Sequence, residues 1–313
     1  MKKPLIVIAG PTASGKSSLS VELAKKINGE IISADSMQVY KGMDIGTAKI
    51  TKQEMDGIIH HLIDVLEPDE PFNVNIFQKL AREAIEEIYS KGKIPIIAGG
   101  TGFYIQAVAY DIDFQETSKD TEYRDYLTKL AEENSTLLFE MLNKLDPQSA
   151  EIIHINNTKR IIRALEYYKQ TGKKISEHNL AEREKESPYK LLFYVLNMDR
   201  ELLYRRIDTR VDIMFEQGLE KEVRGLLEMG YTKDMISMQG LGYKETIDAI
   251  NGEYSFENCI NIIKRDTRHF AKRQLTWFRR EKNVIWLNLE EYQFKNENIL
   301  LKIIKDIEEI RKM

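Results

Sequence analysis

Residues 5–18 read LIVIAGPTASGKSS, an apolar run followed by a glycine-rich turn and a Lys-Ser pair. Residues 10–17 match the whole phosphate-loop pattern G-x-x-x-x-G-K-[ST], which lies between a strand and a helix. In such a loop, backbone N–H groups surround phosphate oxygens, the lysine adds a positive charge and the last hydroxyl can bind Mg²⁺. The loop predicts a phosphate ligand and leaves open which one. The candidate phosphate-binding residues are Gly10, Pro11, Thr12, Ala13, Ser14, Gly15, Lys16 and Ser17, and Ser17 is the candidate metal ligand.

Strand and helix patterns alternate along the first hundred residues. Apolar runs at 5–9, 30–34 and 94–98 indicate strands, and helical patterns at 17–27 and 75–90 separate them. This alternation predicts an α/β fold, a P-loop NTPase-like parallel sheet core with helices on both faces. Ligands of such sheets collect beyond the carboxyl ends of the strands. Three of these ends carry polar signatures, GPTASGKSS, DSMQVY and GGTGFY, and we expect them to form one site.

Long, highly charged helical stretches begin near residue 115, with leucines spaced three and four apart. The runs at 191–199 and 284–289 are again typical of strands. We therefore expect a P-loop core in residues 1–114, an all-helical insertion domain in 115–190, and a mostly helical completion of the core in 191–313.

Composition limits the class of protein. Charged residues make up 31% of the 313-residue chain, and no apolar run approaches the roughly 20 residues of a membrane span. The start MKKPLIVIAG is not expected to be a signal peptide, because its apolar run is short and ends in Gly-Pro. The single cysteine, Cys259, is compatible with a reducing compartment and is expected to be inert core. We expect a cytoplasmic protein without a membrane partner, and a monomer because there is no heptad seam.

Asp35 follows an apolar strand and is expected to face the phosphates. Its carboxylate could bind Mg²⁺, act as a general base or cap a helix. Ser36 and Gln38 add a hydroxyl and an amide, the group type that reads a base edge, and Tyr40 could stack on a base.

Thr101 lies in the turn formed by residues 99–102, Gly-Gly-Thr-Gly. The glycines allow backbone to approach a ligand closely, and Thr101 offers an uncharged hydroxyl. A bare turn is the alternative.

Two arginines of one helical pattern, Arg206 and Arg210, are four residues apart and therefore share a face. They could be a solvated face, or they could hold a diphosphate, since arginine binds phosphate bidentately.

The net charge of −4 argues mildly against a nucleic-acid partner, but the chain also has two local clusters of basic residues. Residues 259–282 carry eight basic and two acidic side chains, with Trp277 and Phe278 among them, and Lys159, Arg160 and Arg163 form a second cluster. Each is either an exposed helix face or part of a nucleic-acid interface.

The chain resembles the bacterial tRNA dimethylallyltransferase family from residue 5 to about 287, in the order and spacing of its motifs. The motifs that carry the resemblance are GPTASGKS, DSMQVYKGMDIGTAK, HHLID, GGTGFY, KRIIRALE, RELLYRRIDTRVDIM, QGLGYKE and KRQLTWFR. The resemblance implies transfer of a dimethylallyl group from dimethylallyl diphosphate to the exocyclic amine of the adenine 3′ of the anticodon. It also implies a Mg²⁺ requirement and a helical insertion that grips the anticodon stem of tRNA.

The resemblance also implies roles for individual residues. Asp35 would take the amine proton, Thr101 would position the reacting groups, and Arg210 would join Lys16 and Ser17 with Mg²⁺ in holding the diphosphate. The residues implied to contact tRNA are Asp35, Ser36, Met37, Gln38, Thr101, Arg124, Lys159, Arg160, Ile161, Ile162, Arg163 and Gln239. Ile50 and Ile59 depart from the family, where many members carry proline, and we expect altered loop stiffness rather than lost activity.

Two other functions fit the phosphate loop. A small-molecule kinase would use Asp35 to activate an acceptor hydroxyl and Arg210 on the transferring phosphoryl group. A prenyltransferase acting on free adenine nucleotides would need no tRNA. A GTPase switch is disfavoured, because the chain has no Asp-x-x-Gly sequence.

Overall fold

The computed structural model describes residues 2–114 and 121–312, which divide into two compact units. Of these residues, the first unit takes 2–111 and 187–312, and the second takes 112–114 and 121–186. The expected start of the insertion, residue 115, lies outside the described residues. In the described part of the chain, no helix combines the length and the apolar character that crossing a membrane demands.

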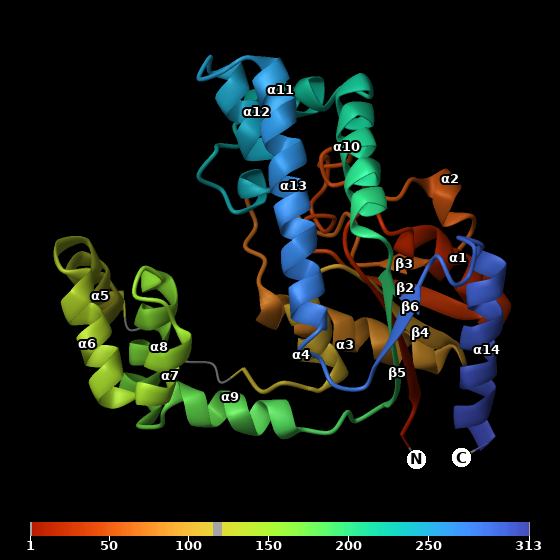
Figure 1. Cartoon of the computed structure of the whole chain (residues 1–313), viewed down its shortest axis with the longest axis horizontal. Coiled ribbons are helices and arrows are strands. Elements are labelled where there is room, and N and C mark those ends of the chain that lie inside the picture. Colours follow the sequence, from red (N-terminus) through yellow and green to blue (C-terminus); the bar gives the residue numbers. More distant parts are fainter. Residues whose placement is uncertain (1, 115–120, 313) are drawn as a thin grey trace. The chain divides into compact units, whose positions relative to one another are not determined.

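A parallel sheet of six strands forms the centre of the first unit (Figure 1). Its strand order is β3-β2-β4-β1-β5-β6, and every neighbouring pair is parallel. This confirms the predicted α/β class. The sequence pattern missed only β3, because two residues are too short for a periodic signal. The strands are β1 (Pro4–Ala9), β2 (Gly29–Ala34), β3 (His60–His61), β4 (Ile94–Gly99), β5 (Lys190–Asn197) and β6 (Val284–Asn288).

Helices cover both faces of this sheet, since parallel strands need crossover connections. On one face, α1 (Lys16–Ile27) packs against β2, β4 and α14 (Asn296–Lys312), as Figure 1 shows. On the other, α3 (Val74–Ser90) packs against β2, β4 and α4 (Gly102–Ala109). The sequence reasoning did not anticipate α14, whose Ile299, Leu300 and Ile303 are buried in the core of the α1 face. The short helix α2 (Lys52–Met55) begins with a capping box formed by Thr51 and Glu54.

Four further helices of the first unit pack against one another: α10 (Arg200–Glu216), α11 (Leu219–Glu228), α12 (Tyr243–Ile250) and α13 (Phe256–Phe278). The 3₁₀ turn η1 (Ser237–Gln239) precedes α12. Cys259 lies on α13 in a small buried cluster with Val211, Ala249 and Ile263. The expected place of Cys259 in the core is confirmed, and burial raises the pKa of its thiol to about 11.

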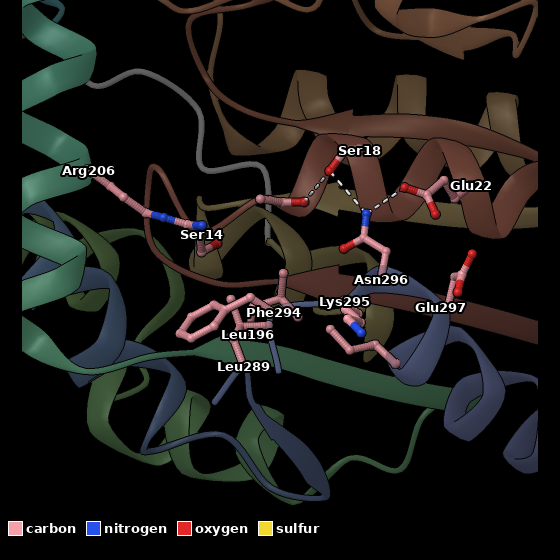
Figure 2. A pocket seen from close by; sticks show the side chains of 12 residues that line it. Ser14, Ser18, Glu22, Leu196, Arg206, Leu289, Phe294, Lys295, Asn296 and Glu297 are labelled. Carbon is pink, nitrogen blue, oxygen red and sulfur yellow. Dashed lines mark hydrogen bonds between the residues drawn. The ribbon is translucent and has the colours of Figure 1, made fainter. Parts of the chain in front are cut away.

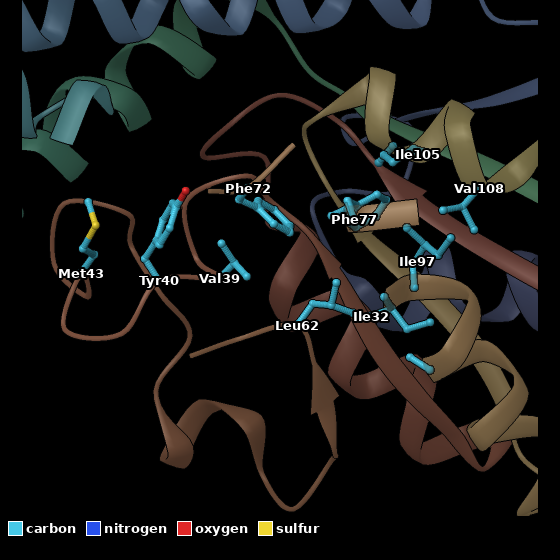
Figure 3. Close-up of a cluster of buried hydrophobic side chains, with 14 of the residues drawn as sticks. Ile32, Val39, Tyr40, Met43, Leu62, Phe72, Phe77, Ile97, Ile105 and Val108 are labelled. Carbon is cyan, nitrogen blue, oxygen red and sulfur yellow. The ribbon is translucent and has the colours of Figure 1, made fainter. Parts of the chain in front are cut away.

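The segment that follows β2 is anchored in the core. Val39, Tyr40 and Met43 are fully buried, and Figure 3 shows them continuing the cluster that includes Phe72 and Phe77. The rings of Tyr40 and Phe72 meet edge to face, 6.4 Å apart. Because this apolar anchoring is continuous, the polar residues 35–38 are held at the end of the strand.

The second unit is all-helical within its described residues. Its core contains Leu127, Leu138, Leu142, Ile161 and Leu165. Leu138 and Leu142 are four residues apart on one helix, as are Ile161 and Leu165 on another. Polar side chains cap three of its helices, Asn134, Asp146 and Asn157, each accepting from a first-turn N–H. The helices are α5 (Thr121–Glu133), α6 (Ser135–Leu145), α7 (Pro147–Ile152), α8 (Thr158–Thr171) and α9 (Ile175–Glu184).

Candidate active site

The ends of β1, β2 and β4 lie side by side. Gly99 is in register with both Ala9 and Ala34, so the segments after all three strands start from one line across the sheet. The Thr101 N–H donates to the Ala34 carbonyl, 3.2 Å away, which ties the Gly-Gly-Thr-Gly turn to the residue that precedes Asp35. The three polar signatures therefore share one edge of the sheet.

The phosphate loop spans residues 10–17 and leads directly into α1, which begins at Lys16. Gly15 has φ 89°, a backbone conformation that favours glycine, at the point where the loop turns into the helix. A helix N-terminus with unpaired N–H groups is therefore presented at the end of β1, as anion binding requires.

Lys16 folds across the loop that contains it. Its Nζ donates to the Pro11 carbonyl at 2.6 Å and lies 3.5 Å from the Ser14 hydroxyl. Burial and the positive charge of Arg210 lower the pKa of Lys16 to about 7, against the opposing effect of Asp35. The neutral amine that is present near pH 7 is therefore poised to gain a proton when an anion enters.

Asp35 is a partly buried carboxylate at the end of β2. Its Oδ1 accepts from the Met37 N–H at 2.9 Å. Burial raises the pKa of Asp35 above its usual value, although the Met37 N–H, Lys16 and Arg210 oppose the rise. A carboxylate of raised pKa is a better general base than an ordinary aspartate.

Arg210 contacts the loop from α10. Its Nη1 donates to the Thr12 hydroxyl at 3.2 Å. Burial lowers the pKa of this guanidinium, yet an arginine stays charged throughout the physiological range. It therefore adds a fixed positive charge beside Lys16 and Asp35.

Arg206, one turn earlier on α10, borders a cavity of about 450 Å³ beside the loop. Figure 2 shows its side chain extending toward Ser14. The same view shows Asn296, at the start of α14, donating to Ser18 and Glu22 of α1. The sequence did not predict the side of the cavity that α14 forms, because α14 itself was not predicted. Arg210 thus contacts the loop directly, and Arg206 borders the cavity beside it.

The glycines around Thr101 serve a purpose that the sequence reasoning did not predict. A Cβ at Gly100 would lie 2.1 Å from Gln274 Nε2, and one at Gly102 would lie 2.2 Å from Trp277 Cδ1. These two glycines admit two side chains of α13. The expectation that the turn also lets backbone approach a ligand closely stays a prediction. Gln274 itself went unrecognised, although it lies between the buried Ala271 and Phe278 on the apolar face of its helix.

Two of the proposed base-reading side chains have structural partners. Tyr40 is fully buried, so its predicted stacking on a base is wrong. The Gln38 amide lies within hydrogen-bond range of the Thr47 and Ala48 carbonyls, at 3.3 and 3.4 Å, and of the Ser33 hydroxyl. Ser36, Met37 and Gln38 remain partly exposed.

On α8 of the second unit, Lys159, Arg160 and Arg163 are exposed. Ile161 and Ile162 belong to the buried core of that unit, so their side chains are not available to tRNA and that interpretation is corrected. The five consecutive residues 159–163 include both the exposed basic face and the buried apolar face of α8.

Arg124 and Gln239 were also assigned to tRNA. Arg124 binds Glu166 through two hydrogen bonds of 2.8 Å, so it joins α5 to α8. Gln239 is exposed in η1, and its Nε2 donates to the Lys233 carbonyl at 2.5 Å.

The basic stretch of α13 separates into two groups. Three of its cations form ion pairs with acidic residues: Lys264 with Asp212, Arg265 with Asp266, and Arg268 with Asp208. The other group lines an open cavity of about 360 Å³, formed by His269, Lys272, Arg273, Thr276, Trp277 and Arg280. The cavity, rather than the whole stretch, is the candidate nucleic-acid surface.

Metal binding must be judged from the donor set. Among residues 2–114 and 121–312, no three acidic, histidine or cysteine side chains group as a metal site. The Ser17 hydroxyl is exposed at the start of α1. A single hydroxyl suits Mg²⁺ that takes its remaining ligands from a phosphate and water, because Mg²⁺ keeps several waters and binds substrate phosphates.

Comparison with known proteins supplies an independent view. The model of the IPP transferase family matches residues 38–281, and that of the isopentenyl transferase family matches residues 3–67. The curated tRNA dimethylallyltransferase of Lachnoclostridium phytofermentans is 58% identical over 308 residues, 98% of either chain.

Two solved structures are similar over most of their length. The tRNA isopentenylpyrophosphate transferase of Bacillus halodurans superposes with a TM-score of 0.75 at 44% identity, over 99% of both chains. A eukaryotic dimethylallyltransferase acting on tRNA reaches a TM-score of 0.79 at 34% identity, over 91% of this chain and 74% of its own.

Proposed function

The chain belongs to the IPP transferase family, and from this premise we propose that it transfers a dimethylallyl group from dimethylallyl diphosphate to a tRNA. The acceptor is the exocyclic N6 amine of the adenine on the 3′ side of the anticodon, and diphosphate is released. The observation that carries this proposal is the meeting of a phosphate loop and a carboxylate of raised pKa at adjacent strand ends with a partly buried arginine of α10. The relatives named tRNA dimethylallyltransferase support the same reaction.

The reaction forms a bond between N6 and C1 of the dimethylallyl group and breaks the bond between C1 and the diphosphate oxygen. Positive charge develops on the allylic carbon and negative charge on the departing diphosphate. The loop N–H groups, Lys16 and Arg210 stabilise that negative charge where it develops. Asp35 accepts the proton that N6 loses, and Thr101 holds the reacting groups in place.

Mg²⁺ fits the leaving-group side of this site. Ser17 would hold it, and the bound ion would supply charge neutralisation of the diphosphate. The Mg²⁺ requirement is tested by removing divalent ions with a chelator and restoring activity with Mg²⁺.

The partner is a tRNA, and the adenine must leave its stack to reach a strand end. The exposed cations of α8 and the cavity on α13 are the surfaces that we assign to the RNA, each within its own unit. We also expect a cytoplasmic monomer, and sedimentation of the purified chain tests its oligomeric state.

The deciding experiment combines the protein with Mg²⁺, dimethylallyl diphosphate and tRNA that lacks the modification. Mass spectrometry should find one dimethylallyl group on the adenine 3′ of the anticodon. Turnover of AMP or ATP without tRNA would instead support a nucleotide prenyltransferase. Phosphorylation of an acceptor with ATP would instead support a kinase.

A further inference from the structure

Gln274 joins two segments of the candidate active site. It lies on α13 and is 7% exposed. Its Oε1 accepts from the Thr12 N–H of the phosphate loop at 2.9 Å, and its Nε2 donates to the Gly100 carbonyl at 3.0 Å. The two segments lie at the ends of the neighbouring strands β1 and β4, and this one side chain hydrogen-bonds to both of them.

The two partners determine which side chain can make this bridge. A backbone N–H can only donate and a carbonyl can only accept, so the bridging group needs one acceptor and one donor. A glutamine amide provides both without charge. A carboxylate lacks the donor, and methionine of similar length lacks both groups.

The Thr101 turn is shaped to receive this amide. A side chain at Gly100 would force Gln274 Nε2 to shift, and one at Gly102 would force the Trp277 ring to shift. Gln274 and Trp277 are three residues apart and therefore neighbours on the same side of α13. They contact the residues immediately before and after Thr101.

The bridge continues to the charged side of the site. Thr12 accepts from Arg210 through its hydroxyl while its N–H donates to Gln274. One connected set of hydrogen bonds thus runs from Arg210 through Thr12 and Gln274 to the Gly100 carbonyl, and the Thr101 N–H continues it to Ala34. The groups assigned to the leaving diphosphate and those assigned to the adenine are joined through a single neutral amide.

We propose that Gln274 is a positioning residue for the transfer, setting the place of Thr101 relative to the phosphate loop. The inference rests on the proposed function. Its physical basis is that attack on carbon requires the amine, the carbon and the departing oxygen to be aligned. A displacement of about 1 Å between the two sides can cost on the order of 10²-fold in rate.

The first test replaces the amide by an apolar side chain of similar length, Gln274→Met. We expect the single-turnover rate with saturating dimethylallyl diphosphate and tRNA to fall about 10²-fold. The dissociation constants for tRNA and for inorganic diphosphate should change less than about threefold, because the binding groups remain. The matched control is Gln78→Met, since Gln78 is a glutamine of α3 that is 6% exposed and donates to the Ala107 carbonyl of α4 rather than to the phosphate loop or the Thr101 turn.

The second test, Gln274→Glu, keeps the shape and removes the donor. Burial raises the pKa of the introduced carboxyl, and its protonated form regains a donor for the Gly100 carbonyl. The rate of the variant relative to wild type should therefore recover as pH falls from 8 to 5.5. Taking the ratio removes the titration of Asp35, which both proteins share.

The outcomes of these tests distinguish a failure of the proposed function from a failure of the positioning role. An inactive wild type would overturn the proposed function. An active wild type with an unchanged rate in Gln274→Met, or with equal losses in Gln274→Met and Gln78→Met, would overturn the positioning role alone. If Gln274→Met fails to unfold cooperatively, Gln274→Glu decides, and a pH-independent ratio counts against the role.

Discussion

At the scale of single residues, the pKa values of Lys16 and Asp35 are shifted in opposite directions from their ordinary values. Burial lowers the pKa of the ammonium to about 7 and raises that of the carboxylate. Pairs of groups whose pKa values are pushed by burial are typical of sites that move protons or bind ions. Here the amine can respond to an incoming anion, and the carboxylate can receive a proton.

Asp35→Asn should remove the base while keeping the size of the side chain. We expect turnover to fall about 10² to 10⁴-fold, because that is the contribution of a positioned carboxylate. The tRNA dissociation constant should stay within about threefold of wild type. Single-turnover kinetics and filter binding measure the two quantities, and a variant that binds and reacts normally would remove Asp35 from the chemistry.

Lys16 predicts a pH dependence of diphosphate binding. Below pH 7 the ammonium is already protonated, and above pH 7 binding must supply the proton, so affinity is lost as pH rises through 7. At pH 8, calorimetry in two buffers should find about one proton more taken up by wild type than by Lys16→Arg, whose guanidinium stays charged. Equal uptake by both proteins would contradict the lowered pKa.

At the scale of elements, α13 performs two tasks on opposite sides. Ala271, Gln274 and Phe278 face the core and the candidate active site, while Lys272, Arg273 and Arg280 line an open cavity. The cations nearer the start of the helix are paired with carboxylates: two with aspartates of α10, and Arg265 with Asp266 of α13 itself. Net charge along the sequence does not distinguish these groups, whereas their partners do.

This division predicts unequal effects of equal charge changes on α13. Lys272→Gln with Arg273→Gln should weaken tRNA binding and reduce its logarithmic salt slope by about two. Lys264→Gln with Arg265→Gln removes the same charge from ion-paired positions and should leave the slope nearly unchanged. Binding titrations from 50 to 300 mM salt compare the two, and identical slopes would exclude the cavity as an RNA contact.

On α8, Lys159→Glu with Arg160→Glu should weaken tRNA binding at least about tenfold, because both cations are exposed. Diphosphate affinity should be unaffected. Lys129→Glu with Lys144→Glu makes the same charge change on α5 and α6 and should cost less. If the control pair weakens binding as much, the effect is general charge rather than a contact of α8.

At the scale of the whole molecule, each unit has its own hydrophobic core. The chain leaves the first unit and returns to it at neighbouring points, since the Ser187 hydroxyl donates to the Ala109 carbonyl at 2.6 Å. The sheet, the phosphate loop, Asp35, Thr101 and Arg210 all belong to the first unit. We therefore expect the proposed binding of prenyl diphosphate to depend on this unit, and RNA binding to draw on both.

Replacing residues 112–186 by a short Gly-Ser linker should leave a first unit that unfolds cooperatively. We expect it to bind inorganic diphosphate within about threefold of the full chain and to bind tRNA at least about tenfold more weakly. Thermal unfolding and the two binding titrations check this. Loss of diphosphate binding in a folded variant would show that the second unit also supports the phosphate loop.

Local patterns in the sequence were sufficient for much of the fold and for the identity of the central side chains. Apolar runs predicted β1, β2, β4, β5 and β6, and one loop motif with the polar strand ends predicted a shared site. These signals are short-range, since the periods of strands and helices and the turn glycines act within a few residues. The phosphate loop and the polar strand ends depend only on these short-range signals, so they could be predicted without a structure.

Burial and long-range partners were decided only by the tertiary structure. The sequence does not state that Tyr40 and Ile161 face a core, or that Arg124 binds Glu166. Nor does it state that a glutamine near the end of the chain meets Thr12 and Gly100, because those partners lie 262 and 174 residues away. Sequence by itself determined which chemical groups are present and which elements carry them. Folding decided which groups meet, because the pairing energy of a buried polar group depends on its neighbours in space rather than along the chain.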